Sequence, residues 1–67
     1  MSVAKVIELT SASSKSIEDA IEQGVKRADQ TLDQVEVVWV QDIKATVKNG
    51  KIAEWRVNIK VTFLLKN

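Results

Sequence analysis

The sequence predicts an α+β fold of the order β-α-β-β, with a three-stranded antiparallel sheet wrapped on one helix. Three observations lead to this prediction. A run rich in β-branched residues lies at 3–10, apolar residues recur at helical spacing over 17–32, and from residue 35 the apolar period changes to two. Because the chain has only 67 residues, we expect a single domain, 1–67.

The first predicted strand is Val3–Thr10, and the serine-rich stretch Ser11–Ser14 after it is predicted to be a short polar connection. Either Ser14 or Ser16 then caps the helix, since a serine side chain can accept a hydrogen bond from a free N–H group of the first turn. Asp19 follows Ser16 by three residues, which is a weak variant of the capping box.

The helix is predicted from one stripe of apolar and small residues with a spacing of three and four. Its members are Ile17, Ala20, Ile21, Gly24, Val25, Ala28 and Leu32. Charged residues fill the other positions, and Glu22 with Lys26 forms a favourable i,i+4 pair. We expect this charged side to be a solvated helix face and not a site.

Two long strands, Val35–Lys48 and Lys51–Leu65, are predicted on either side of Asn49-Gly50. This dipeptide is the strongest short hairpin signal, because both central positions of a type I′ turn need a positive φ. A turn of two residues sets the register of the strands. The pairs that follow are Lys48–Lys51, Lys44–Trp55, Ile43–Arg56, Gln41–Asn58, Val40–Ile59, Trp39–Lys60 and Val38–Val61.

The hairpin is too long for the helix. A helix of about 17 residues spans roughly 25 Å, whereas strands of about 14 residues span roughly 46 Å. The apolar face also changes along strand two, where Ile43, Ala45 and Val47 point away from the helix unless a bulge near Gln41-Asp42 restores the phase. We expect a neighbouring subunit to cover the overhang. The alternative is a sheet that bends around its own helix.

Size and composition also favour self-association. On folding, a chain this short buries only about 60% of the surface that its unfolded form exposes. It usually needs further stabilisation from disulfides, a bound metal or partner subunits. It has no Cys for disulfides and no His, the commonest zinc ligand. The net charge of +1 lacks the basic excess of nucleic-acid-binding proteins. The longest apolar run, Val37–Val40, is too short to cross a membrane. With no signal-peptide pattern at the N-terminus, we expect a cytoplasmic protein.

No catalytic constellation is visible, since His, Cys and Tyr are absent and only two glycines occur, so we expect no enzyme. The face opposite the helix carries Trp39 among amides and cations, an arrangement that suits a planar aromatic ligand. The alternative is that Trp39 packs against another subunit with Lys60 over its ring as a cation–π contact. Trp55 is predicted to belong to the core or to an interface.

The chain resembles the dodecins over nearly its whole length. The resemblance rests on Val6-Ile7-Glu8-Leu9-Thr10 before a serine-rich turn, on the helix Ile17–Leu32, and on a hairpin containing Val57-Asn58-Ile59-Lys60-Val61-Thr62-Phe63. Dodecins are β-α-β-β proteins that form hollow homododecamers, and many bind flavins. The resemblance therefore implies a self-assembling protein that stores or sequesters riboflavin, FMN or FAD without turnover.

The resemblance also implies a ligand site at Val37, Trp39, Lys44 and Arg56. Val37 stands where dodecins typically have the stacking tryptophan, with Trp39 two residues further on. Arg56 stands where a glutamine usually bonds the ring edge, and Lys44 matches a basic residue often near the flavin phosphate. Some dodecin-like proteins lack the flavin residues and have been associated with cations. The alternative is thus a flavin-free shell with a structural or divalent-cation-binding role, through carboxylates such as Glu36 or Asp42.

Overall fold

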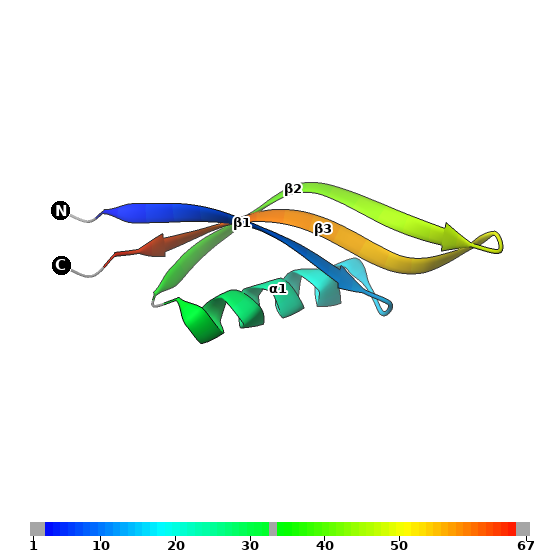
Figure 1. Ribbon diagram of the computed structural model, residues 1–67, viewed down its shortest axis with the longest axis horizontal. Helices are drawn as coiled ribbons and strands as arrows, with labels where there is room; N and C mark the ends of the chain where they lie inside the picture. Colours follow the sequence, from blue (N-terminus) through cyan, green and yellow to red (C-terminus); the bar gives the residue numbers. More distant parts are fainter. Residues whose placement is uncertain (1–2, 33, 66–67) are drawn as a thin grey trace.

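The computed structural model describes residues 3–32 and 34–65, so the ends of the predicted domain 1–67 lie outside the described residues. The elements follow the predicted order: β1 (Ala4–Ser13), α1 (Ile17–Thr31), β2 (Val35–Lys48) and β3 (Lys51–Leu64). All pairings are antiparallel, and the sheet order is β1-β3-β2, so that the last strand is central (Figure 1). The predicted β-α-β-β fold is confirmed.

The first strand is longer than predicted, because β1 continues through the serine-rich stretch. Ser11, Ala12 and Ser13 pair with Val57, Arg56 and Trp55. The long central strand β3 offers backbone partners along its whole edge, and paired backbone is favoured over an unpaired connection. The prediction that 11–14 is a polar connection is therefore wrong for all but its last residue.

The helix begins as one of the two alternatives predicted. Ser16 is the N-cap, and its Oγ accepts a hydrogen bond of 2.9 Å from the backbone N–H of Asp19. The Asp19 carboxylate accepts a hydrogen bond of 2.5 Å from the Ser13 hydroxyl, and this bond lowers the pKa of Asp19 below its usual value. At the other end, Leu32 is the C-cap, and its N–H donates to Ala28 O at 2.9 Å.

The hairpin turn has the predicted backbone conformation. Asn49 and Gly50 have φ values of 54° and 74°, as a type I′ turn requires. Four of the predicted pairs are confirmed. They are Lys48–Lys51 beside the turn and Val40–Ile59, Trp39–Lys60 and Val38–Val61 further along. The two-residue turn sets the register beside it, and the three pairs further along match the prediction because two register shifts in between cancel.

Between these ends the register is displaced by one residue. Ala53 of β3 has no partner on β2, and Gln41 of β2 has no partner on β3, so the two bulges shift the pairing in opposite senses. The predicted pairs Gln41–Asn58, Ile43–Arg56 and Lys44–Trp55 are wrong. The observed pairs are Asp42–Asn58, Ile43–Val57, Lys44–Arg56 and Ala45–Trp55. The bulge considered near Gln41-Asp42 is thus present, and it brings Ile43 and Ala45 onto the side of the sheet that faces α1.

The core lies between α1 and this side of the sheet. Alternate residues of β3, Val57, Ile59 and Val61, are fully buried and form one cluster with Ala20 and Ala28 of α1. Gly24, between the two alanines, makes the close approach of the helix and sheet possible. A Cβ atom at this position would lie 2.8 Å from Ile59 Cδ1 and 3.3 Å from Ser11 Cβ.

The hairpin extends beyond the helix, as the difference in length predicted. The molecule is 51 Å long, and the end of the β2–β3 hairpin reaches past α1 without bending back over it (Figure 1). Ile43, Val47 and Ile52 on this overhang are 50%, 67% and 50% exposed. The alternative of a sheet that hides these residues against its own helix does not hold for the single chain.

Candidate functional site

The candidate site lies on the sheet face that points away from α1, which we call the outer face. Four rows of side chains cross it in the order β1, β3, β2. They are Val6–Thr62–Val37, Glu8–Lys60–Trp39, Thr10–Asn58–Asp42 and Ala12–Arg56–Lys44. Successive rows are about 7 Å apart, because same-face residues on a strand are separated by two residues.

Trp39 is the largest apolar group of the outer face, and its side chain is 63% exposed. Lys60 Nζ lies 5.7 Å from the centre of the indole ring and 3.8 Å from Glu8 Oε1. The contact between Lys60 and Trp39 that the sequence predicted is therefore formed within one chain. An exposed cation–π contact stabilises by only about 0.5–1 kcal/mol and a surface ion pair by no more, so Lys60 is held weakly.

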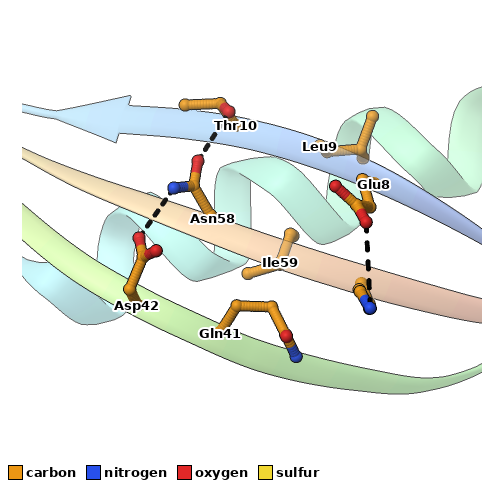
Figure 2. Close-up of a pocket in the computed structure, with 8 residues that line it drawn as sticks. Glu8, Leu9, Thr10, Gln41, Asp42, Asn58 and Ile59 are labelled. Carbon is orange, nitrogen blue, oxygen red and sulfur yellow. Dashed lines mark hydrogen bonds and ion pairs between the residues drawn. The ribbon is translucent and has the colours of Figure 1, made fainter.

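A chain of hydrogen bonds crosses all three strands in the next row (Figure 2). The Thr10 hydroxyl donates to Asn58 Oδ1 at 2.7 Å, and Asn58 Nδ2 donates to Asp42 Oδ1 at 2.7 Å. The bulge at Gln41 creates this row, because under a uniform register Gln41 would stand opposite Asn58. The displaced pairing thus brings a carboxylate to this place.

Two cations face each other in the fourth row. Lys44 and Arg56 are directly opposite on neighbouring strands, an arrangement that is destabilising unless a negative charge lies near it. Arg56 Nε donates to Glu54 Oε1 at 2.7 Å, whereas the described residues provide Lys44 with no ion pair. This end of the outer face therefore favours an anionic group.

An open hollow of about 540 Å³ covers the middle of the outer face. Its lining consists of Glu8, Leu9, Thr10, Gln41, Asp42, Asn58, Ile59 and Lys60. The volume falls within the usual range for sites that hold small molecules. Figure 2 shows the polar side chains of the lining on all three strands, with Gln41 next to Asp42 on β2.

The structure places all four predicted site residues on the outer face, but it does not gather them into one pocket. Val37 is exposed in the first row, and Lys44 and Arg56 lie three rows away, about 20 Å along the strands. None of the four lines the hollow, although Trp39 lies in a row that contributes Glu8 and Lys60 to it.

Sequence reasoning missed Glu8 and Thr10 as site residues. Both lie on β1, and no turn or spacing in the sequence indicates how β1 pairs with β3. Asp42 was considered only as a cation ligand together with Glu36. Among the described residues, no group of three or more acidic, Cys or His side chains is positioned to hold a metal ion. No helix in the described part of the chain is long and apolar enough to cross a membrane.

Comparisons with known proteins agree on one family. The sequence model of the family described as Dodecin matches residues 3–66. The chain is similar to the dodecin from Streptomyces davaonensis, with 30% identity, a TM-score of 0.94, and 98% and 97% of the two chains covered. It is also similar to an arginine-to-alanine mutant of the Thermus thermophilus dodecin, with 30% identity, a TM-score of 0.95, and full coverage of both chains.

A third similar structure is described as a calcium dodecin. This calcium-chelating immunodominant antigen from Mycobacterium tuberculosis, with a novel calcium-binding site, is 32% identical to the chain. The TM-score is 0.83, and the alignment covers 96% of this chain and 91% of the other. No curated protein matches the sequence at a significant level.

Proposed function

The chain belongs to the dodecin family, and from this premise we propose that it is a non-catalytic homododecameric protein that sequesters a flavin: riboflavin, FMN or FAD. The family consists of small oligomeric binding proteins that are generally non-enzymatic. The observation that carries the proposal for this chain is an exposed indole, Trp39, at the side of an open polar hollow on the outer face.

Trp39 supplies the stacking surface in this proposal. An aromatic pair stabilises by about 0.5–1.5 kcal/mol beyond the burial of its area. The stabilisation by stacking matches or exceeds that of the weak contact between Lys60 and the ring, so a flavin can displace the ammonium group from the indole. The displaced ammonium group remains close to Glu8. Val37, two residues before Trp39 on the same face, extends the apolar surface next to the indole.

Lys44 and Arg56 supply the anion site. Their row lies two rows from Trp39, about 14 Å along the sheet. The phosphate of FMN or FAD is separated from the ring by a ribityl chain, which gives the ligand the extended shape that these two places require. The facing cations therefore favour FMN and FAD over riboflavin, which has no phosphate.

Flavin titration tests the ligand. We expect the assembled protein to quench the fluorescence of FMN and riboflavin at micromolar concentrations. Trp39→Ala should weaken the binding of both flavins by about tenfold. Trp39→Phe keeps a stacking ring and is expected to bind at an intermediate level. Lys44→Ala should weaken the binding of FMN but not that of riboflavin. Lys48→Ala, near the turn, is the matched control. Unchanged fluorescence of both flavins with the wild-type protein would contradict the proposal.

The overhang supports the assembly. Ile43, Val47 and Ile52 expose apolar surface that the chain's own helix does not cover, and other copies of the chain are the occupants that the family suggests. Native mass spectrometry tests this directly, because it gives the number of subunits and the mass of bound ligand together. We expect twelve subunits. A stable monomer at micromolar concentration would contradict the proposed shell.

A flavin-free shell that binds a cation is the second candidate. It is favoured by Val37, which cannot stack as an indole does, and by the similarity to the calcium dodecin. Glu36 and Asp42 are exposed carboxylates of β2, and hard cations such as Ca²⁺ prefer oxygen ligands. Calorimetric titration of Ca²⁺ into the wild type and into Asp42→Asn distinguishes this candidate. It requires heat of binding in the wild type, together with flavin fluorescence that the protein does not quench.

A further inference from the structure

We propose that Asp42 is the residue that selects the ligand, by accepting a hydrogen bond from an N–H group at the ring edge. The ligand class is a planar ring with an imide edge, in which one N–H lies between two carbonyl groups. This inference rests on the proposed function and adds to it a specificity-determining residue. Asp42 is held in place by its hydrogen bond from Asn58, which in turn accepts one from Thr10 (Figure 2).

The chemistry of the three side chains gives the chain of hydrogen bonds one direction. The carboxylate of Asp42 can only accept, so the Asn58 group that faces it must be the NH₂ group, as observed at 2.7 Å. The Asn58 carbonyl oxygen then points towards β1, where the Thr10 hydroxyl donates to it at 2.7 Å. If Asn58 turned round, its carbonyl oxygen would face the Asp42 carboxylate and this bond would be lost.

This bonding uses only one oxygen of Asp42. Oδ1 accepts from Asn58, while Oδ2 accepts no hydrogen bond from the described residues. The side chain is exposed and lines the hollow. Charged acceptors form the stronger hydrogen bonds of proteins, particularly when they are held in one position before binding. Asp42 therefore presents one oriented acceptor to whatever enters the hollow.

Two donors lie on one side of this acceptor, towards the row of Trp39. The Gln41 side chain, placed in the hollow by the bulge, carries an amide NH₂ group, and Lys60 of the neighbouring row carries an ammonium group. The lining thus offers one oriented acceptor with two donors beside it. An imide edge presents an N–H group next to carbonyl groups, so its N–H can bond to Asp42 while the neighbouring carbonyl group accepts from Gln41 or Lys60. A ring without this N–H would leave Asp42 facing a carbonyl or a methyl group.

The place of Asp42 agrees with stacking on Trp39. The two residues lie in adjacent rows of the same strand, about 7 Å apart. A fused ring that lies on the indole, at the side of the hollow, can therefore extend one edge into the hollow towards Oδ2. Flavins, lumazines and other rings with a uracil-like edge have this shape, whereas adenine and nicotinamide rings lack the imide group.

The test compares riboflavin with 3-methylriboflavin, in which a methyl group replaces the hydrogen of the imide nitrogen. Fluorescence quenching by the assembled wild-type protein measures both affinities. We expect the methylated flavin to bind at least about tenfold more weakly, as for loss of a hydrogen bond to a charged group. Asp42→Asn can keep an oxygen for Asn58 and replaces the free acceptor by a donor. This variant is expected to bind riboflavin about tenfold more weakly than the wild type and to lose the preference for riboflavin over 3-methylriboflavin.

Asp29→Asn on α1 is the matched control, because it removes the same charge from an exposed position outside the site. Equal affinity of the wild type for the two flavins would overturn the role of Asp42 and leave the proposed flavin site intact. If the wild type binds neither flavin, both the role of Asp42 and the proposed flavin site are overturned. The comparison of the two flavins on the wild type decides the matter even if Asp42→Asn does not assemble.

Discussion

The two faces of β3 have opposite properties although they belong to one run of residues. Val57, Ile59 and Val61 are at most 1% exposed and pack on α1, whereas Arg56, Asn58 and Lys60 alternate with them on the outer face. One set holds the helix on the sheet, and the other presents the amide of Asn58 and the ammonium group of Lys60 to the hollow, with Arg56 beyond its edge. Stability and ligand chemistry are therefore separated by strand parity, and mutations on the two faces should have different consequences.

The largest expected effect is on the buried face. Ile59→Ala removes a fully buried side chain that contacts α1 and should lower the free energy of unfolding by about 2–5 kcal/mol. Denaturant unfolding at one protein concentration measures it, since assembly makes apparent stability depend on concentration. Lys60→Ala, the next residue on the other face, should change it by less than about 1 kcal/mol. Equal losses would contradict the separation of the faces.

A smaller loss is expected where α1 touches the same residue. Gly24→Ala improves helix propensity by about 1 kcal/mol, but its methyl group would lie 2.8 Å from Ile59 Cδ1. Ile59 is fully buried and has little room to move, and overpacking costs about 1–3 kcal/mol. We expect a net loss of about 1 kcal/mol in thermal unfolding. Gln23→Ala on the exposed side of α1 is the control, and a Gly24→Ala variant more stable than wild type would show that the core can adjust.

Lys60→Met tests the outer face, where we expect only a small effect on stability. It removes the ammonium group over Trp39 and its contact with Glu8, so we expect a change of less than about 0.5 kcal/mol in unfolding free energy. The emission of Trp39 should lose its dependence on salt, because screening no longer alters a charge beside the indole. Salt titration of tryptophan fluorescence measures this in a Trp55→Phe background, which leaves Trp39 as the emitting tryptophan, and Lys5→Met is the control. An unaltered salt response would show that Lys60 does not act on the ring.

The smallest effect concerns the end of β1 and the start of α1. The Ser13 hydroxyl lowers the pKa of Asp19 from the usual value of 3.8, so the folded state favours the carboxylate. This stability is present above about pH 3.8 and is lost as the pH falls through the lowered pKa of the folded protein.

Ser13→Ala should therefore raise the pKa of Asp19 and flatten the dependence of stability on pH in that acidic range. An NMR titration of the Asp19 carboxyl carbon, together with thermal unfolding over the same pH values, measures both. Ser14→Ala, in the exposed residue that follows, is the control. An Asp19 pKa that does not rise in Ser13→Ala would show that the hydroxyl is not the cause of the shift.

The sequence by itself determined the elements, because they depend on local chemistry. The turn at Asn49-Gly50, a serine cap at Ser14 or Ser16 and the apolar stripe of α1 each involve residues close together in the chain, and the structure selects Ser16 as the cap. The pairs beside the turn could be predicted for the same reason, whereas the pairs Val38–Val61 to Val40–Ile59 match the prediction because the two bulges cancel. Val37, Trp39 and Arg56 could also be assigned to one face, since parity on a strand is local, whereas Lys44 has the opposite parity and reaches this face only through the bulge at Gln41.

Only the tertiary structure decided what those residues meet. The bulges at Ala53 and Gln41 together displace the five pairs between them, and they bring Asp42, not Gln41, opposite Asn58. The pairing of β1 with β3 then adds Thr10 and Glu8 to the outer face and extends β1 to Ser13. Bulges and the pairing of distant strands depend on the balance of packing over the whole sheet, which no short stretch of sequence encodes. The site therefore exists only after β3 has acquired a neighbour on each side.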